Sequence, residues 1–120
     1  MTQKRWRAKI REAAKEAGTY RPYFDKVIDT LAAILEQRDK AKAKFEEDGG
    51  QLVVEFTNKN GAVNLTQNPM LRMINDLNRD ALAYWRDLGL TPAGLKKIDE
   101  NAMKPKKRNA LAEALKELGQ

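Results

Sequence analysis

The side chains that carry out most enzyme chemistry are scarce in this sequence of 120 residues. It contains no cysteine, no histidine and no serine. Thiol and serine nucleophiles, disulfides and the usual zinc ligands are therefore excluded, and so is the imidazole that most often transfers protons near neutral pH. The pair Gly49-Gly50 is followed by Gln51 and not by the lysine of a phosphate-binding loop. We expect no catalytic residues, no metal and no cofactor.

Acidic side chains gather in two places, at residues 46–48 and at three aspartates of a later helical pattern, Asp76, Asp80 and Asp87. A metal-dependent nuclease would need several such acids to converge on one point. Asp76 instead has Arg72 and Arg79 at helical neighbour distances, which is typical of a solvated face with salt bridges. A small nuclease is therefore the weakest of the functions considered.

Lysine and arginine give the more informative pattern, because they are unevenly placed. The chain has a net charge of +6; residues 1–21 carry +5 and residues 96–108 carry +4, whereas residues 22–95 sum to −2. Two basic ends around a nearly neutral middle indicate an anionic partner, most commonly nucleic acid.

The N-terminal basic residues fall along a predicted helix over residues 4–17. Like charges four residues apart weaken an isolated helix by a few tenths of a kcal/mol, so such a stripe is a candidate for phosphate contact. The alternative is a solvated face that only aids solubility. A second candidate is the basic linker over residues 104–108. The predicted DNA contacts are Lys4, Arg5, Arg7, Lys9, Arg11 and Lys15, together with Lys104, Lys106, Lys107 and Arg108.

The elements that must position these residues are mostly helical. Gly18 ends the first predicted helix, and apolar residues at steps of three and four then predict a long helix of roughly 25 residues, up to Phe45. Its apolar seam resembles that of a coiled coil, although Arg38 interrupts it. Gly49-Gly50 ends this helix.

A β-hairpin is predicted next. Leu52, Val54 and Phe56 alternate onto one face of its first strand, and Asn60-Gly61 supplies residues that accept the positive φ of a tight turn. An isolated two-stranded hairpin is marginally stable in water. We therefore expect it to lie on the helices or to pair with a neighbouring chain.

Two cap-plus-proline devices start the later helices, at Asn68-Pro69 and at Thr91-Pro92. The first of these helices ends at Gly89, and the second is short, running through Ile98. A last amphipathic helix is predicted over residues 109–119. The residues of the helix after Asn68 that we expect to face inward are Leu71, Ile74, Leu77, Ala81, Leu82, Trp85 and Leu88.

The predicted fold is mainly α with one β-hairpin: a long helix, then the hairpin and a helical C-terminal half, assembling into a ring. We divide the chain into a basic N-terminal helix (1–18), a core with the oligomerisation helices and the hairpin (19–101), and a basic linker with a C-terminal amphipathic helix (102–120). No apolar run approaches the ~20 residues of a membrane span, and no signal peptide is present, so we expect a cytoplasmic protein.

Self-association is expected because the core is lean. The mean hydropathy is −0.71, and short chains bury a smaller share of their surface than long ones. A closed cyclic homo-oligomer satisfies every interface. The predicted interface residues are Phe24, Ile28, Leu31 and Leu35 of the long helix and Leu52, Val54 and Phe56 of the hairpin.

The ordered set of motifs resembles the small subunit of phage terminases. The matching residues are the Asn68-Pro69 helix start, Tyr84-Trp85-Arg86-Asp87 and the turn Leu88-Gly89-Leu90-Thr91-Pro92, with Gly18-Thr19-Tyr20 and a hairpin upstream. The resemblance covers residues 18–98. The family often carries small-small-Arg-x-Arg after the Thr-Pro, but this chain has Leu95 at the first arginine and Lys97 at the second, so no role of that first arginine is transferred.

The resemblance implies a non-catalytic helical adaptor in the host cytoplasm that forms a ring and recognises double-stranded viral DNA near the packaging start. It also implies a partner, the terminase large subunit, which holds the ATPase and the nuclease. The alternative is a small basic DNA-binding regulator or nucleoid-type protein, which would be a dimer. The number of subunits in the oligomer separates these two hypotheses.

Overall fold

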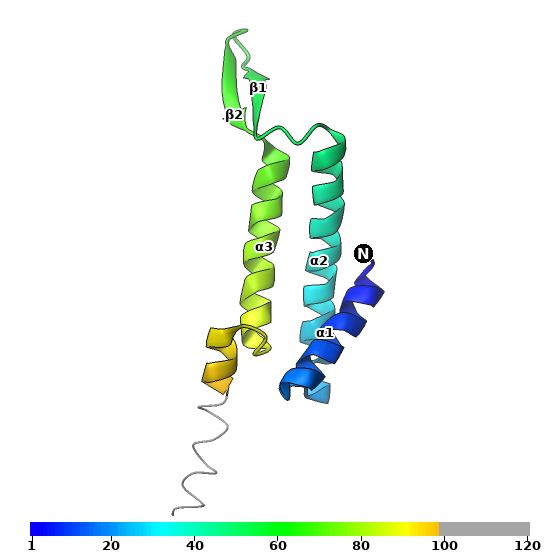
Figure 1. Ribbon diagram of the computed structural model, residues 1–120. Helices are drawn as coiled ribbons and strands as arrows, with labels where there is room; N and C mark the ends of the chain where they lie inside the picture. Colours follow the sequence, from blue (N-terminus) through cyan, green and yellow to red (C-terminus); the bar gives the residue numbers. More distant parts are fainter. Residues whose placement is uncertain (99–120) are drawn as a thin grey trace, which may run out of the picture.

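The structure is a computed structural model that describes residues 1–98 (Figure 1). Residues 92–98 form a further short helix. The prediction of a mainly helical fold with one hairpin is confirmed, and the predicted linker and C-terminal helix lie outside the described residues. The elements are α1 (Gln3–Ala17), a 3-10 turn (Pro22–Phe24), α2 (Asp25–Glu47), β1 (Val53–Thr57), β2 (Val63–Gln67) and α3 (Pro69–Asp87).

Most helix ends follow from local sequence. Thr2 caps α1 by accepting a hydrogen bond from the backbone N–H of Arg5, and Asn68 caps α3 in the same way for Met70. Gly18 and Gly89 lie just past the ends of α1 and α3 with φ of 75° and 71°, a conformation that glycine adopts at little cost. Thr91 caps the short last helix, because its Oγ1 accepts the N–H of Gly94 at 3.0 Å. The predicted cap residues are therefore confirmed.

The core forms where three helices meet. α2 and α3 run side by side in opposite directions, and α1 lies against the first half of α2 (Figure 1). The core cluster contains Ile10 of α1, Ala81 and Leu88 from and just after α3, and the apolar seam of α2, with Trp6, Trp85 and Leu90 packed around it. The division at residue 18 thus separates α1 from helices with which it shares this core. Of the seven residues expected to face inward after Asn68, Leu82 is the exception, at 49% exposed.

The hairpin extends beyond the helices and is not covered by them (Figure 1). β1 and β2 pair antiparallel, with Val54 opposite Thr66 and Phe56 opposite Asn64. The connecting loop spans residues 58–62. Asn58 organises it, since its Oδ1 accepts the N–H groups of both Asn60 and Ala62, and only Gly61 has positive φ. Positive φ was thus predicted correctly for Gly61 but not for Asn60, and the hydrogen bonds of the loop come from the side chain of Asn58.

The turn after α3 is closely packed. A Cβ atom at Gly89 would lie 2.6 Å from Cδ1 of Ile98 and 2.9 Å from Cγ2 of Thr19, and one at Gly94 would lie 2.2 Å from the carbonyl oxygen of Arg86. Both positions thus require glycine for space. Thr19, in the α1–α2 turn, is itself buried. The two turns at this end of the molecule consequently fix each other.

Candidate nucleic-acid interface

The exposed basic surface lies at the N-terminal end of α1. Lys4, Arg5 and Lys9 are exposed, and residues 1–11 contain five basic residues and no acidic one. The first turn of α1 also contains no acidic residue. The positive end of the helix macrodipole disfavours cations at this place. The basic residues therefore destabilise α1 slightly and concentrate positive electrostatic potential at its N-terminal end.

Two of the predicted DNA contacts are engaged within the subunit. Arg7 Nε donates to Asp29 Oδ1, and Arg11 Nη2 lies 3.3 Å from Asp25 Oδ1. Both arginines are about one third exposed, at 38% and 37%. Their charges are partly compensated by α2, so they attach α1 to α2 and are less available to phosphates than Lys4, Arg5 and Lys9.

Asp25 also accepts a hydrogen bond from the hydroxyl of Tyr20 at 2.9 Å. This hydrogen bond raises the pKa of Tyr20, as does partial burial of the ring. Lys15 Nζ lies 5.1 Å from the centroid of the same ring, a cation–π distance. Lys15 itself is exposed, so its charge is more accessible than those of Arg7 and Arg11.

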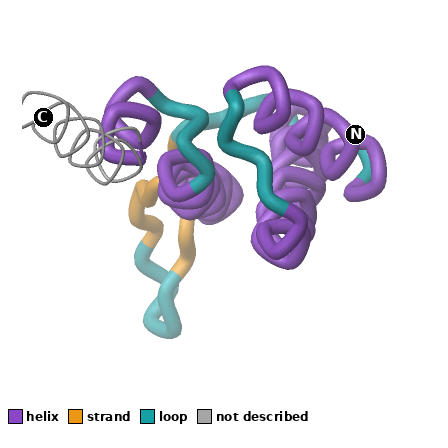
Figure 2. The backbone as a smooth tube through the Cα atoms, turned by 90° about the horizontal axis from the view of Figure 1, so that it is seen from below, coloured by secondary structure: helices purple, strands orange, loops and turns teal. Residues whose placement is uncertain are grey.

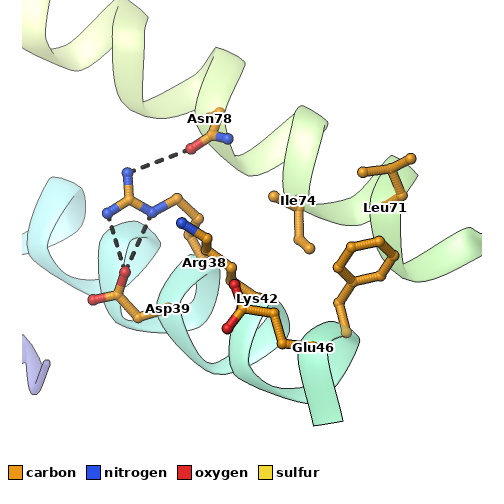
Figure 3. A pocket seen from close by; sticks show the side chains of 8 residues that line it. Arg38, Asp39, Lys42, Glu46, Leu71, Ile74 and Asn78 are labelled. Atoms are coloured by element: carbon orange, nitrogen blue, oxygen red, sulfur yellow. Dashed lines mark hydrogen bonds and ion pairs between the residues drawn. The ribbon is translucent and has the colours of Figure 1, made fainter. Parts of the chain in front are cut away.

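Arg38, which interrupts the predicted seam of α2, joins all three helices. Its Nη1 donates to Asn78 of α3 at 3.4 Å and its Nη2 to Asp39 at 3.0 Å (Figure 3). Its guanidinium lies 5.6 Å from the centre of the Trp6 ring. The long stem of arginine keeps the charged head at the rim of the core, so the interruption is a cross-link between helices.

Asp39 accepts hydrogen bonds from three donors. Trp6 Nε1 donates at 2.7 Å, and Arg38 and the N-terminal ammonium also bind this carboxylate. Burial by itself raises the pKa of Asp39, but these hydrogen bonds outweigh burial and hold the pKa below its usual value. The carboxylate of Glu36 nearby accepts the N–H of Gln3, which together with Lys40 lowers the pKa of Glu36. These acids orient α1 on α2.

A second group of cations lies where the two turns meet. Seen from below, the α1–α2 turn and the turn after α3 run next to each other (Figure 2), and Thr19 and Gly89 are in contact there. Arg21 is exposed on the first turn, and Arg86, Lys96 and Lys97 are exposed around the second. The sequence did not identify this set, because its members come from segments about 65 residues apart. In the sequence, Arg21, Lys96 and Lys97 contributed only to the net charge of the two basic ends.

The predicted oligomer interface divides into two parts. Ile28, Leu31 and Leu35 are fully buried within the subunit, at 0% exposed, and Phe24 packs partly against the same core. In this fold those three side chains already have partners in α1 and α3.

The hairpin residues are different, since Leu52 and Phe56 are 61% and 58% exposed and Val54 is half-buried. Val53, Val63 and Leu65 are exposed as well, and the register places them on the opposite face of the hairpin from Val54 and Phe56.

Among residues 1–98, no group of three or more His, Cys, Asp or Glu side chains could hold a metal ion. No helix in that part of the chain is both long enough and apolar enough to cross a membrane.

Comparison with known proteins identifies one family. Residues 2–105, most of the chain, match the family described as phage terminase, small subunit. No curated protein and no solved structure matches. The matched range includes α1 and everything after it in the described structure, and it also takes in the Asn68 cap and the Gly89 turn on which the resemblance rested. The chain belongs to the phage terminase small subunit family.

Proposed function

We propose that this terminase small subunit binds double-stranded viral DNA, assembles with copies of itself into a ring, and recruits or regulates the large ATPase/nuclease subunit during genome packaging. Family membership supports the packaging role. The cationic surface of α1 supports DNA as the ligand, and the uncovered hairpin supports assembly. This non-catalytic adaptor would act in the host cytoplasm without a cofactor.

The observation that carries the DNA-binding part is the cation cluster at the start of α1. Lys4, Arg5 and Lys9 are exposed and make no ion pair within residues 1–98. Lys4 and Arg5 lie in the first turn of α1, where the macrodipole favours an anion, and Lys9 lies one turn further on. A phosphate placed there would relieve the repulsion among the cations and release counterions.

The remaining predicted contacts take a lesser part in this proposal. Lys15 is exposed beside Tyr20. Arg7 and Arg11 would attract phosphate less strongly, because their aspartate partners on α2 partly neutralise their charges. The linker cations Lys104, Lys106, Lys107 and Arg108 lie outside the described residues, and we propose them as a second phosphate contact. Contacts of this kind position the protein on DNA without specifying a sequence.

The salt dependence of DNA binding tests this assignment. Replacement of Lys4, Arg5 and Lys9 by glutamine should flatten the slope of log affinity against log salt by about 0.9 per lost contact, about 2.7 for three. The matched control replaces Lys42, Lys59 and Arg72, which are also exposed and carry the same total charge. An equal flattening in the control would mean that net charge and not the α1 surface governs binding.

For the ring, the proposal rests on the hairpin. Five apolar side chains, one just before β1 and four on the two strands, are more than half exposed: Leu52, Val53, Phe56, Val63 and Leu65. Such a hairpin is marginal alone, so a neighbouring copy is the natural source of burial. Native mass spectrometry should show a closed oligomer of many subunits. A monomer at micromolar concentration, or a dimer, would contradict it, and a dimer would favour a DNA-binding regulator.

A further inference from the structure

A methionine-lined groove runs between α2 and α3, on the side opposite to the contact between Arg38 and Asn78. Met70, Met73 and Leu77 of α3 and Ala41 of α2 form its floor, and Lys40 and Lys44 are on its α2 rim. The groove has a volume of about 530 Å³, and Met73 is 51% exposed. Methionine adapts its shape to an apolar partner more readily than other side chains. The groove is therefore an apolar surface that residues 1–98 leave uncovered, with its side chains at helical spacing.

The spacing matches a segment of the same chain that lies beyond the described residues. Leu111, Leu115 and Leu118 are separated by four and then three residues, so they form one stripe on a helix. Leu77, Met73 and Met70, read in the reverse direction, have the same separations. Two antiparallel helices with these stripes would place Leu115 against Met73, with a leucine on each side of it.

We propose that residues 109–120 dock as a helix, antiparallel to α3, into the groove of their own subunit. This proposal does not depend on DNA binding or on the ring. The family match ends at residue 105 and does not cover the docking segment. Its acids, Glu113 and Glu117, lie away from the leucine stripe by helical spacing and would remain in water.

The connecting chain is long enough. Eleven residues lead from Ile98 to Asn109, and a fully extended chain spans at most ~3.3–3.6 Å per residue, about 36–40 Å in total. Ile98 lies at the end of α3 that carries Gly89. From there to Leu77 the helix rises about 1.5 Å per residue, roughly 15–18 Å. An antiparallel arrangement is also the one in which the segment enters the groove from the nearer end.

The surface between Ile98 and the groove suits the linker. Asp76, Asp80 and Asp87 are exposed on α3, and at ~100° per residue they fall within about 60° of Met73, on the side of that residue away from α2. Only Asp76 has an ion pair within residues 1–98, a surface contact with Arg79 at 3.8 Å, which is weak. The linker cations Lys104, Lys106, Lys107 and Arg108 would run along this acidic stripe. They would then serve either α3 or DNA phosphates, so the two sites compete for the linker.

Disulfide formation tests the docking directly, because the chain has no cysteine of its own. The full-length double variant Met73→Cys with Leu115→Cys should form an intramolecular disulfide under mild oxidation in the absence of DNA. The control pair is Leu82→Cys with Leu115→Cys. Leu82 is 49% exposed, is nearer to Ile98 along α3, and lies nine residues from Met73, on the opposite face of the helix.

The expected result is rapid cross-linking of the first pair and at least tenfold slower cross-linking of the control. Equal rates would overturn the proposal, since they would mean that the segment samples both faces. A covalent dimer in place of a cross-linked monomer would overturn docking within one subunit and assign the segment to a neighbouring copy.

A second measurement needs no cysteine. The chain has four methionines, so the methyl spectrum of the full-length protein is simple. Leu115→Asp should shift the methyl signals of Met70 and Met73 and leave that of Met1 in place. Unchanged Met70 and Met73 signals would contradict the proposal even if the variant remains folded. A loss of DNA binding with normal cross-linking would instead count only against the proposed function.

Discussion

The two ends of the α2–α3 pair use the same kinds of apolar residue in opposite ways. At the end where α1 joins them, Ile28, Leu31 and Leu35 are completely buried within one subunit. At the hairpin end, Leu65 is 75% exposed and Phe56 58% exposed. The first end has its partners within one chain, and the second presents apolar surface that is costly to leave in water. The buried apolar residues at the α1 end therefore stabilise the subunit, whereas the exposed ones at the hairpin end remain available for contacts with another chain.

Truncation of a leucine at each end gives the largest expected difference. Leu31→Ala should lower the free energy of unfolding by about 2–5 kcal/mol, the usual range for a cavity in a packed core. Leu65→Ala should cost less than about 0.5 kcal/mol of subunit stability, yet it should shift the oligomer towards smaller species. Urea titration and native mass spectrometry at matched concentrations measure the two effects. Similar losses of subunit stability would remove the distinction between the ends.

Two glycines with similar backbone angles, one at each end of the α2–α3 pair, allow the packing of the two ends to be compared. Gly89 and Gly61 both have positive φ, of 71° and 81°, so alanine is strained by about 1–2 kcal/mol at either position. Only Gly89 is crowded, with side-chain atoms less than 3 Å from an added Cβ, whereas Gly61 has nothing within 4 Å. Gly89→Ala should therefore cost about 1–2 kcal/mol more than Gly61→Ala. Thermal unfolding of both variants tests this, and equal melting temperatures would contradict the tight packing of the two turns.

A pair of aspartates gives the smallest effect, and it depends on pH. The pKa of Asp39 is lowered in the folded state, so its stabilisation is complete above the unfolded pKa near ~3.9. It is lost as the pH falls through the lower folded pKa. Asp39→Asn should cost about 1 kcal/mol at pH 7 and weaken the loss of stability in acid. Asp48→Asn, which removes an exposed pair with Lys44, should change stability by less than about 0.5 kcal/mol.

Denaturant titrations from pH 7 down to pH 3 compare the two aspartate variants. If Asp48→Asn flattened the pH profile as much as Asp39→Asn, the three-donor site on Asp39 would have no special role.

The features predicted well from the sequence are those decided within a few residues. Helix ends at Gly18, Asn68 and Gly89 depend on local caps and on positive φ, so they can be read without knowing the fold. The order of helices and hairpin follows from apolar periodicity for the same reason.

The features that were missed depend on partners distant in the chain. An apolar stripe shows that α2 must be covered, but the pattern is the same whether α1 or another copy covers it, and the predicted interface at Leu31 and Leu35 depended on that choice. Arg7 and Arg11 were predicted as phosphate contacts without their ion pairs to α2. Their partners, Asp29 and Asp25, lie on another helix, 22 and 14 residues away.

The hydrogen bonds between the base of the hairpin and the start of α3 couple the position of the hairpin to the tilt of α3. The side chain of Asn68 caps α3, its Nδ2 donates to the carbonyl of Gln51 at 2.8 Å, and its backbone N–H donates to Leu52. Asn68 thus joins the base of the hairpin to the start of α3. With α3 about 28 Å long at 1.5 Å per residue, a rotation of roughly 10° about its Gly89 end moves the base of the hairpin by about 5 Å. In the proposed ring, a tilt of α3 would therefore displace the hairpin together with the contacts it makes with a neighbouring copy.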